Sequence, residues 1–181
     1  PDVGASLSDF CDRRLGKGVV HCADRPGFLG NRVGMYTLQV GLIEALERGL
    51  TIEEADAMMG RPMGFPKTGV FGLYDLIGLD LMLDVVESLR TALPPEDAFQ
   101  EVADGIPLVF DLCTRGYTGR KGLGGFYREV NEAGEAQEQA VSLESGKFQD
   151  RAKPVLAAGQ TGESQGLKAM LERDDKYGRF A

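Results

Sequence analysis

The sequence predicts a mainly helical protein with a small β-hairpin near its C-terminal end. Apolar residues recur at steps of three and four over 29–50 and again over 69–93, which is the spacing of helices that bury one face. Between these stretches, Thr51 and Glu54 have the Ser/Thr-x-x-Glu spacing of a helical capping box. Alternation of polar and apolar residues after residue 125 indicates two short strands.

Composition limits the possible functions. A chain of 181 residues with 43% hydrophobic content can bury the core of one domain, and its net charge of −8 disfavours nucleic acid as a partner. No apolar run reaches the roughly 18 residues of a membrane span, and no signal peptide is evident. Cys11, Cys22 and Cys113 fit neither a disulfide framework nor a metal site, so we expect a cytoplasmic protein without a bound metal.

The first predicted elements have the character of α/β structure. Residues 6–15 have the capping and spacing of a short amphipathic helix, and the β-branched run 17–23 indicates a buried strand. One strand leaves both of its edges unpaired, so we expect this pair to be the tail of a larger unit. The strand contains His21, the only histidine, which has no ligand-spaced partner and is expected to be structural, just as the cysteines are expected to be small buried residues.

A sharp turn at 24–28 separates this pair from the helical part of the chain. The first long helix is predicted to end at Gly49, and the helix that starts at Thr51 to end near Gly60. A loop over 61–68 precedes the second apolar stretch, which Gly78 is expected to divide into two helices.

Pro94 and Pro95 break the helical pattern, which resumes in one or two pieces, the second starting near Ile106. The loop 117–125 has the composition of a phosphate-binding loop, but no strand precedes it and no good helix follows, so a plain turn is the favoured interpretation. Strands flanking 131–134 form the predicted hairpin, and 162–176 is predicted to be a short helix.

Asn31 is the most interesting polar residue. It follows the turn at the start of the longest helix, where helix N–H groups and its side-chain amide could face a polar ligand. Equally, Asn31 could simply cap the helix. The residues alone leave both interpretations open.

Three segments resemble one known family. Residues 24–32 (DRPGFLGNR), 61–80 (RPMGFPKTGVFGLYDLIGLD) and 119–127 (GRKGLGGFY) are similar, in this order, to the "DRPGF-x-x-NR", "PMGPF-L-D-VGLD" and "GRK-GRGFY" segments of the 3-hydroxyacyl-CoA dehydrogenases. The longer form of 66–70 and the extension over 128–181 resemble the long multifunctional fatty acid oxidation proteins.

The resemblance implies a fold and a division into domains. We expect the helical C-terminal domain of this family, of the 6-phosphogluconate dehydrogenase C-terminal-domain-like type, over 25–128. Residues 1–24 would be the helix–strand end of an NAD-binding Rossmann domain, and residues 129–181 the hairpin and linker toward a second helical domain.

The resemblance also implies an activity for a full-length enzyme, the NAD-dependent oxidation of 3-hydroxyacyl-CoA to 3-ketoacyl-CoA in fatty acid β-oxidation. The family's catalytic histidine lies in a His-x-x-Asn-Pro motif that this chain lacks, so we expect no catalytic residue, no bound NAD and no turnover in this fragment. Asn31 matches the family's asparagine beside that histidine and the substrate. Lys67, Thr68 and Phe71 are candidates to line the acyl or pantetheine path, although a capped helix start is an equal interpretation.

The expected partners are the acyl-CoA substrate, the chain's own Rossmann and second helical domains, and a second copy in a homodimer. Two alternatives remain open at this stage. One is a stand-alone, non-catalytic helical dimerisation module, and the other is a related hydroxyacid dehydrogenase that shares the helical domain.

Overall fold

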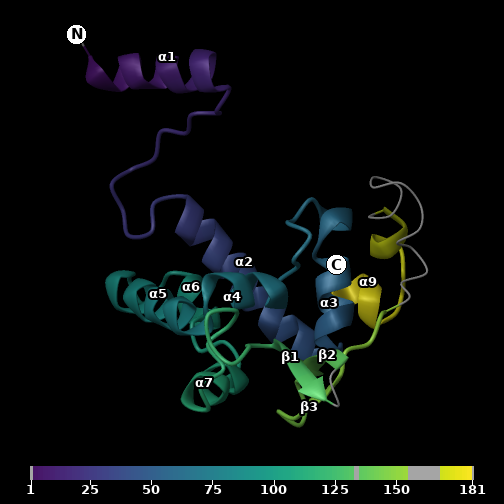
Figure 1. Ribbon diagram of the computed structural model, residues 1–181. Helices are drawn as coiled ribbons and strands as arrows, with labels where there is room; N and C mark the ends of the chain where they lie inside the picture. The colour runs from purple at the N-terminus through teal and green to yellow at the C-terminus, as the bar shows by residue number, and fades with distance from the viewer. Residues whose placement is uncertain (1, 133–134, 155–167, 181) are drawn as a thin grey trace.

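A bundle of helices forms the body of the molecule, and a small antiparallel sheet packs at one end of it (Figure 1). The computed structural model describes residues 2–132, 135–154 and 168–180. Its body contains α2 (Gly30–Glu47), α3 (Ile52–Met58), the 3-10 turn η1 (Arg61–Met63), α4 (Phe71–Ile77), α5 (Leu79–Ala92), α6 (Phe99–Val102) and α7 (Pro107–Thr114). Among the described residues, no helix combines the length and the apolar character needed to cross a bilayer. The mainly helical prediction is confirmed.

The longest helix, α2, buries one face as its apolar spacing predicts. Met35, Leu38, Leu42 and Ala45 lie in the core at steps of three and four. Gly41 on the same face lets α2 approach the segment before α4, because a Cβ there would lie 3.0 Å from the Val70 side chain. The middle of α2 is therefore packed against the start of α4.

The predicted local signals of helix boundaries are confirmed. Thr51 Oγ1 accepts from the Glu54 N–H at 3.2 Å and Glu54 Oε2 accepts from the Thr51 N–H at 3.0 Å, which completes the capping box of α3. Gly78 separates α4 from α5 with φ of 111°, a left-handed value that glycine adopts without steric cost. After the Pro94–Pro95 break the helical spacing resumes in two pieces, and Ile106 is the N-cap residue of α7.

The sheet contains the predicted hairpin and one further strand. β1 (Tyr127–Glu132) pairs antiparallel with β2 (Glu135–Val141), with Tyr127 opposite Ala140. The third strand, β3 (Phe148–Asp150), was not predicted; it pairs with the other edge of β2. Three residues are too few to show an alternating pattern, so β3 forms only because β2 offers it an edge.

The strand predicted over 17–23 is wrong. These residues carry no strand in the structure and are exposed, and they lead from α1 (Val3–Leu15) to the helical body as an extended segment (Figure 1). A strand needs a neighbouring strand to pair with its N–H and C=O groups, and no described strand lies beside residues 17–23. His21 and Cys22 are consequently exposed rather than buried, and Cys11 and Cys113 are only partly buried.

The predicted helix over 162–176 is also corrected. Its first six residues lie outside the described part of the chain, residues 168–171 are helical, and a separate helix, α9 (Lys176–Phe180), follows. Asp175 causes the division, because its Oδ1 accepts from the N–H groups of Tyr177 and Gly178 and so starts a new helix.

Residues after β1 are attached to the body largely through α3. Three of its carboxylates each bind a different segment: Glu53 accepts from the Ala152 N–H at 2.9 Å, Glu54 accepts from Lys176 and Tyr177, and Asp56 accepts from Tyr127. This short helix therefore connects the sheet and α9 to the helical body (Figure 1).

Candidate functional site

Asn31 lies in the first turn of α2 with its side chain exposed. The turn before it uses left-handed backbone at Gly27 (φ 77°) and at Phe28 (φ 47°), which is unusual for a bulky residue. The Asn31 N–H donates to the Gly27 carbonyl at 3.2 Å. Leu29 is the N-cap residue and no side chain caps the helix, so the structure does not support the interpretation of Asn31 as a cap. The Asn31 side-chain amide is therefore exposed and does not cap the helix.

An ion pair holds this first turn in place. Arg32 Nη2 lies 2.7 Å from Asp97 Oδ2, and Asp97 Oδ1 also accepts from the Phe99 N–H at 2.9 Å. The hydrogen bond from Arg32 holds the pKa of Asp97 below its usual range. The helix that carries Asn31 is thus connected to the segment that precedes α6.

Exposed apolar side chains lie on both sides of Asn31 in the sequence. We call them the α2 apolar patch, which consists of Phe28, Leu29, Val33 and Tyr36, whose exposed fractions are 61%, 46%, 58% and 38%. Contiguous exposed apolar side chains are characteristic of contact surfaces. The polar amide of Asn31 therefore stands at the edge of a surface suited to another protein segment.

The other predicted site residues lie elsewhere. Lys67 and Thr68 line a cleft of about 1190 Å³ to which Asn31 does not contribute. Phe71 is fully buried, with its ring 4.8 Å from that of Phe126, so its side chain belongs to the core rather than to a surface path. Ten residues, or about 15 Å of helix, separate Asn31 from the Gly41 that meets Val70. The structure thus divides the predicted residues between two places.

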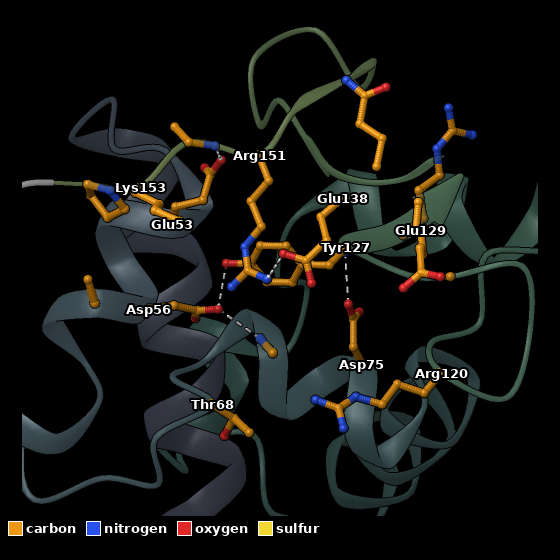
Figure 2. Close-up of a pocket in the computed structure, with 18 of the residues that line it drawn as sticks. Glu53, Asp56, Thr68, Asp75, Arg120, Tyr127, Glu129, Glu138, Arg151 and Lys153 are labelled. Carbon is orange, nitrogen blue, oxygen red and sulfur yellow. Dashed lines mark hydrogen bonds and ion pairs between the residues drawn. The ribbon is translucent and has the colours of Figure 1, made fainter. Parts of the chain in front are cut away.

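The polar cleft, as we call this space, is bounded by several segments distant in sequence. Figure 2 shows side chains converging on it from α3, from Thr68, from α4 and from the Gly-rich loop, together with β1, β2 and residues 151–154. Tyr127 and Arg151 lie at its centre, where the Arg151 guanidinium is 4.6 Å from the Tyr127 ring. Most of the residues that line it are polar or charged.

Two aspartates hold these walls together, Asp75 buried and Asp56 partly buried. Asp56 Oδ1 accepts from the Phe71 N–H at 2.7 Å, and its Oδ2 accepts from the Gly72 N–H at 2.9 Å and the Tyr127 hydroxyl at 2.8 Å. Asp75 accepts from the N–H groups of Phe126 at 2.7 Å and Tyr127 at 2.8 Å. Burial raises the pKa of Asp56 to about 7 and that of Asp75 to about 6, against the effect of these donors. Burial also raises the pKa of Tyr127, which keeps its hydroxyl protonated and able to donate.

The Gly-rich loop is a turn, as predicted. The Gly119 N–H donates to the Gly124 carbonyl at 2.7 Å, and the Arg120 N–H donates to the Asp75 carbonyl at 2.9 Å. The Gly125 N–H is likewise taken by the Tyr127 carbonyl. Because these amides are already bonded, the loop backbone is not arranged to cradle a phosphate.

Sequence reasoning missed the aspartates whose hydrogen bonds hold the first turn of α2 and the walls of the polar cleft. Apart from the Phe99 N–H, which lies two residues from Asp97, the partners of Asp56, Asp75 and Asp97 are 15 to 71 residues away in the chain, so no local spacing could have indicated them. Within the described ranges, no three His, Cys, Asp or Glu side chains are grouped so that they could hold a metal ion.

Comparison with known proteins identifies relatives of this chain. The family model described as the 3-hydroxyacyl-CoA dehydrogenase C-terminal domain matches residues 27–129. A Rickettsia felis protein named as a fatty acid oxidation complex trifunctional enzyme is 33% identical over 99% of this chain, which covers 24% of that protein. This chain therefore spans about a quarter of the length of that curated relative.

Two crystal structures are similar in fold. That of FadB2 from M. tuberculosis has a TM-score of 0.55 and 28% identity, covering 70% of this chain and 42% of its own. That of the (S)-3-hydroxybutyryl-CoA dehydrogenase PaaH1 from Ralstonia eutropha has a TM-score of 0.52 and 30% identity, covering 66% and 40%.

Proposed function

The chain belongs to the 3-hydroxyacyl-CoA dehydrogenase family, whose C-terminal domain it contains, and we propose that it serves this activity within a longer enzyme. In that enzyme a 3-hydroxyacyl-CoA of fatty acid β-oxidation is oxidised to the 3-ketoacyl-CoA. The single observation that supports this role is the side-chain amide of Asn31, which is exposed beside the α2 apolar patch and does not cap the helix.

Asn31 is proposed to bind the reacting end of the substrate. In the family reaction, hydride leaves C3 for NAD while a histidine removes the hydroxyl proton. We assign the catalytic histidine and the NAD site to a Rossmann domain, because this chain has no His-x-x-Asn-Pro motif. The Asn31 amide would donate to an oxygen that gains negative charge, and the turn at Gly27 and Phe28 would hold it in position.

The residues of this chain do not fit NAD. The sequence has no Gly-x-Gly-x-x-Gly segment between a strand and a helix, and the amides of its Gly-rich loop bond within the protein. We therefore assign this domain to substrate contact and to packing, and NAD to the Rossmann domain. Lys67 and Thr68 remain candidates for the acyl or pantetheine path, supported by their place in an open cleft, whereas the burial of Phe71 gives it no such support.

The α2 apolar patch is proposed to pack against protein. Its occupant would be the chain's own Rossmann domain or a second copy, and residues 129–181 would form the hairpin and linker toward the second helical domain. A cytoplasmic location is proposed because the three cysteines are free.

The test uses the full-length enzyme. We expect N31A to lower turnover of a 3-hydroxyacyl-CoA by at least roughly tenfold, because one preorganised donor is lost. The matched control is N131A, which truncates another exposed asparagine, on β1, and should leave turnover unchanged. Equal rates for N31A and the unaltered enzyme would exclude the proposed role.

The two alternative functions predict different experimental results. If the full-length protein oxidises free hydroxyacids in preference to acyl-CoA, it is a related hydroxyacid dehydrogenase. If the gene encodes no His-x-x-Asn-Pro motif, the domain is a non-catalytic dimerisation module.

A further inference from the structure

The carboxylates of the polar cleft are almost all occupied by the protein itself. Both oxygens of Asp56 and both of Asp75 accept hydrogen bonds, three and two respectively. Glu53 accepts from the Ala152 N–H, and Glu138 is paired with Arg151 at 2.9 Å. Glu129, which is exposed, is the remaining carboxylate of the lining and has no side-chain partner among the described residues.

Of the five basic side chains that line the cleft, two have partners within the protein and three do not, among the residues that the structure describes. Arg151 is paired with Glu138, and Arg128 donates to Gln139 and Tyr117. Lys67, Arg120 and Lys153 also line the cleft, and their side chains make no hydrogen bond or ion pair to any part of the chain that the structure describes. Three cations are thus available to a ligand, opposed by one carboxylate.

We propose that the polar cleft binds a small organic anion through its phosphate groups, with Arg120 and Lys67 as the principal contacts. A ligand with two or more negative charges fits best, because the available cations come from three separate segments. Arginine binds phosphate oxygens in a two-pronged geometry, and lysine acts as a point charge. The lining carries five basic and five acidic side chains, so in a chain of net charge −8 the cleft is less negative than the molecule as a whole.

Size and protonation agree with this ligand class. The cleft volume of about 1190 Å³ exceeds what inorganic phosphate needs and accommodates a nucleotide-sized molecule. Burial raises the pKa of Asp56 to about 7, which reduces the negative charge that an incoming phosphate meets near neutral pH. Thr68 adds a hydroxyl to the same wall (Figure 2).

This site shares Lys67 and Thr68 with the proposed acyl or pantetheine path and in that respect rests on the proposed function, but it does not include Asn31. Binding at the cleft involves no residue near Asn31 and can be measured without turnover. The phosphates could belong to coenzyme A or to a free nucleotide, so the experiment includes both.

The test is calorimetric titration of the full chain with pyrophosphate, ADP and coenzyme A at low ionic strength. We expect saturable binding that R120Q and K67Q each weaken at least tenfold, while K147Q, a control at an exposed lysine outside the cleft, leaves it unchanged. Arg120 and Lys67 are exposed, so unchanged circular dichroism should accompany the loss.

Each outcome is decisive. Comparable binding of ADP and coenzyme A would support a general phosphate site, and a strong preference for coenzyme A would identify its tail as the ligand. No saturable binding of any of the three up to millimolar concentration would overturn the proposal, as would an equal loss in K147Q. Retained binding in the N31A enzyme, together with its reduced turnover, would separate this site from the function of Asn31.

Discussion

Arg32 and Asp97 form a 2.7 Å ion pair that fastens the first turn of α2 to the residues before α6. Their side chains are 29% and 19% exposed, whereas those of the comparable pair Arg90–Asp104 are 51% and 86% exposed. Partial burial reduces screening by water, so the first pair should matter more than the second.

We therefore expect R32A to lower the melting temperature by about 3 °C and to speed hydrogen exchange in the first turn of α2. R90A is the matched control, because it removes an exposed pair from α5. Thermal unfolding and exchange mass spectrometry measure both effects. An equal destabilisation by R90A would show that the position of the pair is irrelevant.

Gly125 offers a test of the packing at Asp75. A Cβ at this position would overlap the Asp75 carboxylate, which binds the N–H groups of Phe126 and Tyr127. We expect G125A to lower the free energy of unfolding by at least about 2 kcal/mol, because two buried hydrogen bonds are displaced. G34A is the control: Gly34 lies in α2 with open space around it, so alanine should be neutral or stabilising there. Chemical denaturation that ranks the two variants equally would contradict this account.

The signals that sequence reasoning used correctly are local ones. Thr51 and Glu54 are three residues apart and bind each other, and Gly78 acts through its own backbone. Such features depend on no distant partner, so the spacing alone predicts the helix boundaries.

The errors share one physical cause, which is dependence on distant neighbours. The apolar run 17–23 forms no strand because no described strand lies beside it, whereas three-residue β3 forms because β2 is adjacent. Asn31, the proposed substrate contact, could be found from its motif. The polar cleft could not, because Asp56 and Tyr127 meet across 71 residues.

The raised pKa values predict an unusual dependence of stability on pH. The folded-state pKa of Asp56 is about 7 and that of Asp75 about 6, both above the ordinary value of 3.8, so the folded protein holds more protons than the unfolded chain between about pH 4 and 7. The free energy of unfolding should therefore fall as pH rises through this interval.

Denaturation at a series of pH values measures this slope, and D75N should flatten it. D84N removes the same formal charge from an exposed position on α5 and should retain the slope of the unaltered protein. Carbon-13 titration of the aspartate carboxyl groups gives an independent measurement. Midpoints near 4 for both Asp56 and Asp75 would contradict the prediction.

The α2 apolar patch predicts self-association of this chain in isolation. Exposed apolar side chains gain free energy when a second copy covers them. Sedimentation velocity should show a dimer at high protein concentration, and V33D should shift it toward monomer. L171D alters an exposed leucine outside the patch and should leave the dimer intact. A monomer at every concentration would argue against the patch as an interface between copies.

The three carboxylates of α3 have a consequence for the order in which the chain folds. Glu53, Glu54 and Asp56 meet their partners across 99, 123 and 71 residues, and in each case α3 is the earlier segment. During synthesis the acceptors therefore leave the ribosome well before their donors. Loop closure over such distances is slow, so the sheet and α9 should dock last, onto a helix that its own capping box has already formed.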